Sequence, residues 1–399
     1  MRKHRSDRII AILSLALIMV GLVVIYAIGP MRANFLNSVL GKQVYSEQSF
    51  FVHQLVTAVV AVVVMIIGFK LPYKLMQKYA KILMLGGLLA CALLAMLAFG
   101  KSSLASCQLG GCRWFNLGPV NFQPAELVKL GLVFYIAQLI ATRKKEGRFE
   151  DSKDFWLPFG IVSAVALFFV IVLQKDLGTG AAMIAILLAM LWTSGISLKK
   201  FSIVLASIAV LGALAIIGSP HRMQRLMTFS GKGNGYHINN AMMAIGSGGL
   251  FGVGVGNSVQ ATGYLPESIN DSVFAVMGET FGFVGLMLVV AVFAILLIRL
   301  LKVANTLPDD EQRLAVIGIF AWIVSHVVIN IAAMTGLMPL TGITLPLLSY
   351  GGTSMMFIAL ALGLCLQLSC YTGREVKNEN ISSGRRLGGT HHAGCRRSA

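Results

Sequence analysis

Residues 264–279 read YLPESINDSVFAVMGE, and they lead into an apolar run that continues to Leu301. Glu267 and Asp271 precede this run, whereas Glu279 lies inside it. A carboxylate at or below a membrane surface costs several kcal/mol unless it is paired or used in function. We therefore predict that Asp271 carries the chemistry of this protein. On a continuous helix, Asp271 and Glu279 would be about two turns apart and would point to nearly the same face.

The composition is that of a membrane protein with many spans. Of the 399 residues, 56% are hydrophobic and 12% are charged, whereas about a quarter of the residues of a soluble domain are charged. The apolar runs are each about 20 residues long, which fits transmembrane helices. Segments of about ten residues with alternating hydrophobicity, which are typical of outer-membrane barrels, are absent. We therefore expect an all-α polytopic fold.

The apolar runs predict ten transmembrane helices. They are Ile9–Gly29, Phe51–Phe69, Ala80–Phe99, Ala125–Ala141, Trp156–Leu173, Gly180–Ser197, Phe201–Gly218, Val273–Leu301, Ala315–Thr335 and Ile343–Cys370. We expect them to form one membrane domain over residues 1–371. The basic, Gly- and Ser-rich residues 372–399 are predicted to be a disordered cytoplasmic tail.

Positive charge is concentrated on alternate loops. With the N-terminus in the cytoplasm, the cytoplasmic segments hold most of the 33 Lys and Arg residues. The positive-inside rule therefore predicts that both termini are cytoplasmic. It also accounts for most of the formal net charge of +17 without a nucleic-acid partner.

The same topology makes residues 219–270 a large extracytoplasmic loop between the seventh and eighth spans. Within it, residues 241–256 read AMMAIGSGGLFGVGVG. This segment is too short and too rich in glycine to span a bilayer. We predict a re-entrant or interfacial segment whose backbone is satisfied by protein or cavity water, with a flexible Gly-rich loop as the alternative.

Several charged residues at span ends are candidates for substrate binding. Glu126 and Lys129 are three residues apart on one predicted helix, so they share a face; they form a structural ion pair or contact substrate. Asp176 stands at a predicted helix start, as a capping acid or as a contact for metal or diphosphate. Arg222 and Arg225 suit bidentate phosphate binding, with interfacial snorkelling as the alternative.

The cysteines and the absence of three known motifs limit the kinds of reaction that the sequence supports. Cys107 and Cys112 share one non-membrane loop, where they form a small disulfide or remain free thiols. The sequence contains no Walker-type phosphate loop, no HExxH and no GxSxG. ATP-driven transport and zinc or serine hydrolysis therefore have no support.

These residues stand in motifs that run in order along nearly the whole chain. The motifs are RW (113–114), QPAE (123–126) with Lys129, DLGT (176–179), AIGSGG (244–249), LPE (265–267), Asp271, FAV (274–276), GE (278–279), TGITLP (341–346) and LSYGGTS (348–354). Together they resemble the SEDS family of integral-membrane peptidoglycan glycosyltransferases, FtsW and RodA. The TGITLP motif and the basic tail are more similar to the division branch, FtsW.

The resemblance implies a ten-span fold in the bacterial cytoplasmic membrane that polymerises lipid II at the outer face, at the division septum. It implies a class B penicillin-binding protein and other division proteins as partners. It also aligns Asp271 with the essential acid of the family. The remaining substrate-binding candidates are Arg113, Lys175, Glu267, Ser349 and Tyr350.

The chain departs from the family pattern near the proposed acid. His237 and Asn240 stand where the family usually has Gln, and Ala241 stands where it has Ser. Asn270 replaces a common Thr directly before Asp271. The residues around Asp271 therefore differ from the family pattern, whereas Asp271 itself matches it.

The reaction that the resemblance implies needs a base and a positively charged site. The sugar 4-hydroxyl of one lipid II attacks the anomeric carbon of a strand that is linked to undecaprenyl diphosphate, and Asp271 is the candidate general base. Arg or Lys side chains, or a divalent cation (Mg²⁺ or Mn²⁺) with Asp271 as a candidate ligand, would stabilise the leaving diphosphate. No organic cofactor is expected. The alternatives are a lipid-precursor flippase and a non-catalytic scaffold for division proteins.

Overall fold

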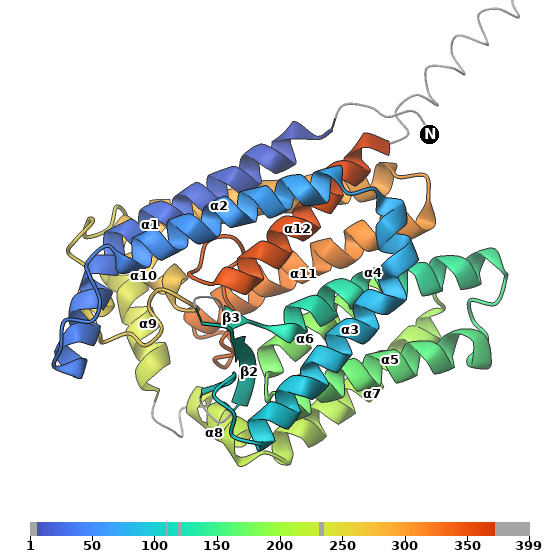
Figure 1. The fold of residues 1–399 in the computed structure, drawn as a ribbon, viewed down its shortest axis with the longest axis horizontal. Helices are drawn as coiled ribbons and strands as arrows, with labels where there is room; N and C mark the ends of the chain where they lie inside the picture. Colours follow the sequence, from blue (N-terminus) through green and yellow to red (C-terminus); the bar gives the residue numbers. More distant parts are fainter. Residues whose placement is uncertain (1–5, 109–110, 119–120, 231–234, 372–399) are drawn as a thin grey trace, which may run out of the picture.

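The computed structural model describes residues 6–108, 111–118, 121–230 and 235–371. The predicted tail over residues 372–399 lies outside the described residues. Helices dominate the fold, together with one small sheet (Figure 1). The main helices are α1 (Arg8–Leu40), α2 (Ser49–Lys70), α3 (Tyr73–Phe99), α4 (Pro124–Lys145), α5 (Leu157–Leu167), α6 (Leu177–Thr193), α7 (Leu198–Ile217), α8 (Pro220–Phe229), α9 (Tyr236–Ser247), α10 (Val273–Thr306), α11 (Asp310–Met334) and α12 (Gly352–Leu368).

The expected all-α polytopic fold is confirmed. Nine helical segments of the described chain are long and apolar enough to cross a membrane, and α6 is a tenth apolar helix of 17 residues. The fifth segment combines α5 with π-helical turns at Ser152–Trp156 and Phe168–Leu173. Each predicted span therefore contains an apolar helix, although several boundaries differ.

The last predicted span was wrong in its first part. We expected one helix over Ile343–Cys370, but α12 begins only at Gly352 and residues 339–351 are irregular. Pro346 has no backbone N–H to give to a helix. Leu347 adopts a positive φ of 62°, which continues no helix. The apolar residues of this segment are buried as a loop against the bundle, so hydropathy could not distinguish them from a span.

Small residues allow the helices to pack closely. α2 lies along α12, and α3 lies along α4. A Cβ on Gly68 would lie 2.7 Å from the Leu360 carbonyl oxygen, and one on Gly363 would overlap the Met65 carbonyl. Such contacts between backbones are typical of membrane helices, which gain little from the hydrophobic effect on association.

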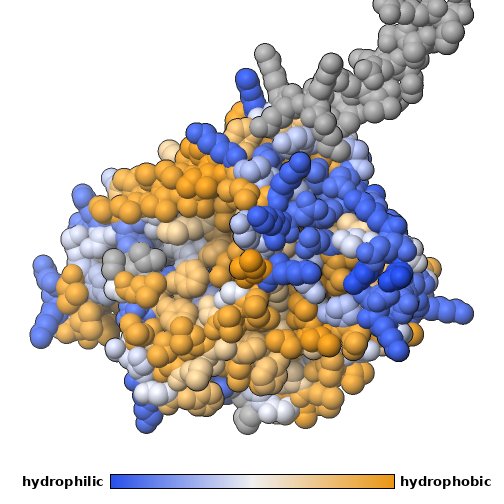
Figure 2. Space-filling view, turned by 45° about the vertical axis from the view of Figure 1, so that its right-hand side comes forward, coloured by the Kyte–Doolittle hydropathy of each residue, from blue (hydrophilic) through white to orange (hydrophobic). Residues whose placement is uncertain are grey.

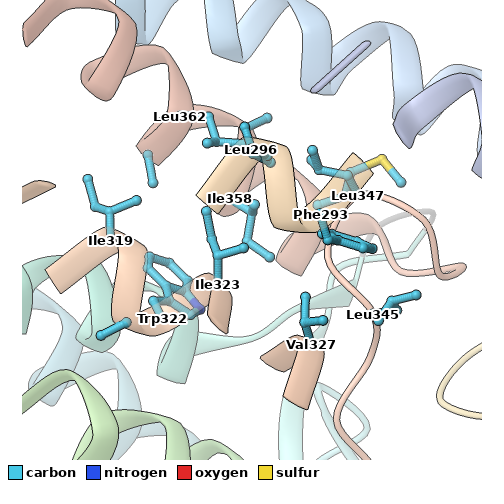
Figure 3. Packing of buried hydrophobic residues seen from close by; sticks show 14 of the residues in the cluster. Phe293, Leu296, Ile319, Trp322, Ile323, Val327, Leu345, Leu347, Ile358 and Leu362 are labelled. Atoms are coloured by element: carbon cyan, nitrogen blue, oxygen red, sulfur yellow. The ribbon is translucent and has the colours of Figure 1, made fainter. Parts of the chain in front are cut away.

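The core runs through most of the helices, and one part of it lies where α10, α11, α12 and the irregular loop meet. Phe293 of α10, Trp322 of α11 and Ile358 of α12 point toward one another, and Leu345 and Leu347 of the loop close the cluster (Figure 3). This packing holds the loop in place beside the first turn of α10.

Polar and apolar surfaces are segregated. Orange, hydrophobic side chains cover most of the face in Figure 2, and hydrophilic ones gather at the end where α4 finishes. Ion pairs at that end include Lys144–Asp310 (3.2 Å) and Arg299–Asp7 (2.7 Å). The opposite end carries the sheet, α8, α9 and the segment before α10 (Figure 1).

The sheet is a short antiparallel structure between α3 and α4. β1 (Ala105–Gln108) pairs with β2 (Gly111–Asn116), which pairs with β3 (Asn121–Phe122). Cys107 and Cys112 are joined by a disulfide, so the disulfide alternative is the one that the structure shows.

The Gly-rich segment is a helix followed by a turn. α9 ends at Ser247, and the turn over residues 248–256 docks onto a kink of α10 at Gly282, where φ is 68°. The backbone N–H groups of Val253 and Gly254 donate to the carbonyls of Glu279 and Thr280 (2.9 and 3.1 Å). The turn therefore satisfies α10 carbonyls that the kink leaves without helical partners, as we expected for irregular backbone in this loop.

Candidate active site

Asp271 is fixed by its backbone at a junction of three segments. It lies two residues before α10 begins at Val273. The side-chain amide of Asn330, on α11, donates to the Asp271 carbonyl and to the Ile343 carbonyl, both at 2.7 Å. One buried side chain thus joins the segment before α10, helix α11 and the irregular loop.

The Asp271 carboxyl is half-buried at this junction. Burial raises its pKa to about 7, and the neighbouring Glu267 carboxylate adds to the rise, while Ser272 and Arg225 oppose it. A carboxyl with a pKa near neutral can accept a proton in one step and release it in the next. This is the environment that a general base requires.

His237 and Ser272 form a hydrogen-bonded pair beside Asp271. His237 Nε2 lies 2.7 Å from Ser272 Oγ. The Ser272 hydroxyl is within reach of two acceptors, the Pro266 carbonyl at 2.9 Å and Asp271 Oδ1 at 3.4 Å. Burial lowers the pKa of His237, so its ring favours the neutral form. His237, which stands where the family usually has Gln, therefore contacts Ser272, the residue next to the candidate base Asp271.

Arg113 of β2 reaches the same place from the sheet. Its Nη2 donates to the Lys175 carbonyl at 2.9 Å, and its Nε lies 3.9 Å from Asp176 Oδ2. A Cβ built on Gly342 would lie 3.8 Å from Asp271 Oδ2 and 4.0 Å from Arg113 Nη1. The carboxylate and the guanidinium therefore face the same small space next to Gly342.

The two arginines of α8 differ in their surroundings. Arg225 Nη1 donates to the Leu340 carbonyl at 3.0 Å, and its charge interacts with those of Arg113 and Asp271. Arg222 donates to the carbonyls of Ala215 (2.9 Å) and Ile171. Arg225 belongs to the Asp271 neighbourhood, whereas Arg222 binds backbone at the ends of neighbouring spans.

Asp176 is a helix cap, as one of its two alternatives predicted. Its Oδ1 accepts from the Thr179 backbone N–H at 3.0 Å, and its Oδ2 accepts from the Thr179 hydroxyl at 2.9 Å. Gln123 also donates to it at 3.4 Å. The exposed Lys175 precedes it with a positive φ of 53°, and its contribution to the site is the carbonyl that holds Arg113.

Glu126 and Lys129 form an enclosed ion pair inside the bundle. Lys129 Nζ donates to Glu126 Oε1 at 2.9 Å and lies 3.0 Å from His326 Nε2. It also sits 4.7 Å from the centre of the Trp322 ring. Both side chains are almost fully buried, with 0% of Lys129 and 3% of Glu126 exposed. These contacts fit the structural ion-pair alternative.

Glu267, Ser349 and Tyr350 shape the segments around Asp271. Glu267 is exposed, has a positive φ of 50° and accepts from the Asn270 side chain. Ser349 Oγ accepts from the Leu345 backbone N–H at 2.8 Å. The Tyr350 backbone N–H donates to the Ile269 carbonyl at 2.9 Å. Ser349 and Tyr350 thus fold the irregular loop and attach it to the Asp271 segment.

Glu279 does not share a face with Asp271, contrary to our prediction. Asp271 precedes the helix, so no regular helical spacing relates the two residues. The Glu279 carboxylate accepts from the Ser258 hydroxyl and from the backbone N–H of Val259 at 2.9 Å and of Gln260 at 3.2 and 3.3 Å. This carboxylate anchors residues 258–260, which directly follow the Gly-rich turn.

The comparisons with known proteins agree with this architecture. The family model described as cell cycle protein, FtsW/RodA/SpoVE, matches residues 7–374. The chain belongs to the FtsW/RodA/SpoVE family. Stage V sporulation protein E of Bacillus subtilis is 31% identical over 378 residues, covering 93% of this chain and 99% of that protein. Probable peptidoglycan glycosyltransferase FtsW of Escherichia coli O6:H1 is 31% identical over 358 residues, with 88% and 84% covered.

Solved structures share the FtsW/RodA/SpoVE fold. One, described as "Structural coordination of polymerization and crosslinking by a peptidoglycan synthase complex", superposes with a TM-score of 0.71 at 24% identity, covering 91% of this chain and 97% of that chain. The rod shape determining protein RodA of Thermus thermophilus gives a TM-score of 0.65 at 24% identity, covering 91% and 96%.

Within this family member, sequence reasoning missed three residues that support Asp271. Asn330, Ser272 and His237 were not predicted as site residues, yet each bonds to Asp271 or to its neighbour. Asn330 carried a signal, because an uncharged amide in the apolar run of α11 needs buried partners. Ser272 and His237 meet only when α9 packs against α10, so nothing in the sequence indicated their contact.

The described side chains near Asp271 do not by themselves supply enough ligands for a divalent cation. Among the described residues, no cluster of three or more His, Cys, Asp or Glu side chains could hold a metal ion. Mg²⁺ commonly binds through one or two carboxylates, water and substrate phosphates. The described residues offer Asp271 as a single carboxylate, so a divalent cation there would also need water and substrate phosphates as ligands.

Proposed function

We propose that this chain is a peptidoglycan glycosyltransferase that polymerises lipid II into glycan strands. The observation that carries the proposal is the convergence of Asp271 and Arg113 on the space beside Gly342, in a chain of the FtsW/RodA/SpoVE family. A base with a pKa near 7 next to guanidinium groups suits a reaction that deprotonates a hydroxyl and releases a diphosphate.

The Asp271 carboxylate accepts the proton of the attacking sugar 4-hydroxyl. The new glycosidic bond forms as the bond between the anomeric carbon and the diphosphate oxygen breaks, with inversion. In this proposal, the charges of Arg113 and Arg225 stabilise the leaving diphosphate. Asn330 holds the Asp271 backbone, so the base stays in place through the reaction. A bound Mg²⁺ or Mn²⁺ would supply additional positive charge at the diphosphate.

The reaction site faces the outside of the cytoplasmic membrane in this proposal. Disulfides persist in oxidising compartments, and Cys107–Cys112 lies in the sheet beside Arg113. The basic loops lie at the other end, as the positive-inside rule requires of the cytoplasmic side. We further propose a class B penicillin-binding protein as the partner and the division septum as the location.

The test is polymerisation of labelled lipid II by the purified protein, alone and with its class B partner. Asp271→Asn keeps the size of the side chain and removes the base, so we expect a loss of at least ~100-fold at equal thermal stability. Glu146→Gln, an exposed acid at the opposite end, is the matched control and should retain activity. Equal polymer from wild type and Asp271→Asn would exclude Asp271 from catalysis. No polymer with the partner present would favour a flippase or a scaffold.

A further inference from the structure

The sheet carries a covalent link directly beside Arg113. Cys107 and Cys112 are paired in register on β1 and β2 and form a disulfide. β1 has four residues and β2 has six, and a sheet of this size is only marginally stable by strand pairing. A cross-link opposes opening of the hairpin by restricting the open state.

The hairpin is also fitted closely to the segment that precedes α6. A Cβ on Gly111 would lie 2.6 Å from the Gln174 carbonyl oxygen and 3.5 Å from Arg113 Nε. Arg113 Nη2 donates to the next carbonyl, that of Lys175, at 2.9 Å. The position of the guanidinium therefore depends on the position of the hairpin.

Arg113 retains donors for a ligand. A guanidinium has five N–H donors, and the buried Nε of Arg113 makes no hydrogen bond within the described part of the chain. Its Nη1 faces the space beside Gly342 that Asp271 Oδ2 also faces. Nη1 is therefore the Arg113 donor that is oriented toward the place where the proposed reaction releases diphosphate, whereas Nε lies 3.9 Å from Asp176 Oδ2.

We propose that the Cys107–Cys112 disulfide positions Arg113 for diphosphate binding, so that the oxidised protein binds the lipid diphosphate more tightly than the reduced protein. This inference rests on the proposed function for its ligand. The disulfide does not touch the substrate and acts through Arg113. Reduction leaves two thiols, frees the hairpin to open, and releases Arg113 from the carbonyl of Lys175.

The experiment compares the oxidised wild type with Cys107→Ser/Cys112→Ser, with Arg113→Ala, and with the variant that combines all three changes. Binding of undecaprenyl diphosphate in detergent and polymerisation of labelled lipid II are both measured. We expect the serine pair to weaken binding roughly tenfold and to raise KM more than it lowers kcat, because an orientated charge-assisted contact is lost. The combined variant should be no weaker than Arg113→Ala alone, since the two changes act on one contact.

Dithiothreitol provides a second measurement on folded protein. It should weaken binding by the wild type, reversibly on reoxidation, and should leave the serine pair unchanged, which excludes an effect through Cys91, Cys365, Cys370 or Cys395. Additive losses in the combined variant, or equal binding by oxidised and reduced wild type, would overturn the inference. If the protein polymerises lipid II equally well in the oxidised and reduced forms, the role of the disulfide is excluded and the proposed function stands. If diphosphate binding depends on redox state but no polymer forms, the role of the disulfide stands and the proposed function is excluded.

Discussion

At the scale of single residues, the ionisation of Asp271 determines when the site can act. Burial and the Glu267 carboxylate raise the Asp271 pKa to about 7. The base must be ionised to accept a proton, so activity should rise as the pH increases through about 7. Glu267 is exposed and outside the first turn of α10, which makes its charge removable without disturbing the core.

Glu267→Gln should therefore move the pH profile. Removal of the neighbouring negative charge lowers the Asp271 pKa, so the rising limb of kcat/KM shifts toward lower pH, by less than about one unit for an exposed partner. The measurement is the pH dependence of lipid II polymerisation by wild type and variant. An unchanged midpoint would show that Glu267 does not influence Asp271.

The buried pair Glu126–Lys129 should contribute to stability in a way that exposed pairs do not. Lys129→Met leaves the Glu126 carboxylate buried without its partner, which costs about 3–5 kcal/mol. Thermal unfolding in detergent should show a marked loss for this variant. Glu126→Gln/Lys129→Met removes both charges and should recover part of that loss. If both variants unfold at the wild-type temperature, the pair has no structural role.

Sequence alone offered the disulfide alternative and the capping alternative for Asp176, which the structure shows, because each depends on residue type at a span end or in a short loop. The choice of Asp271 as the base stays a prediction. The sequence could not place His237 and Ser272 beside each other, because they are 35 positions apart and meet only through the docking of α9. It also misjudged Glu279, since the helix that we assumed through Asp271 starts two residues later.

At the scale of elements, the kink of α10 and the Gly-rich turn stabilise each other. Gly252 has a φ of 82°, and a Cβ there would overlap the Thr280 carbonyl. Gly256 has a similar φ of 88° but nothing lies within 4 Å of its Cβ position. A comparison of Gly252 with Gly256 therefore distinguishes the effect of a positive φ from the effect of close contact with α10.

Gly252→Ala should destabilise the protein more than Gly256→Ala. Both variants carry the cost of a positive φ, about 1–3 kcal/mol, but only Gly252→Ala pushes the turn away from α10. Its unfolding temperature in detergent should be the lower of the two. Equal unfolding temperatures would mean that the turn is not held against the kink. Its short length and many glycines predicted a re-entrant or interfacial segment, but the hydrogen bonds that fix it come from a helix that begins later in the chain.

At the scale of the whole molecule, α7 and α11 differ most among the candidate spans in how far they are buried. None of the residues of α7 is buried, whereas α11 is buried along most of its length. Sequence predicted both as spans of similar character, because hydropathy reports transfer into an apolar phase and does not distinguish lipid from protein. The sequence therefore could not show which helices lie inside the bundle and which lie at its surface.

The segregation of charge between the two ends predicts the orientation of the entire bundle. Lys42 is exposed in the loop between α1 and α2, at the Asp271 end, and Lys145 is exposed at the opposite, basic end. In a Cys395→Ser background, Lys42→Cys should react with a membrane-impermeant maleimide on intact cells, and Lys145→Cys should react only after lysis. Cys91, Cys365 and Cys370 are buried, so they contribute little label. The reverse pattern would place Asp271 on the cytoplasmic side, where the proposed polymerisation could not build a wall outside the membrane.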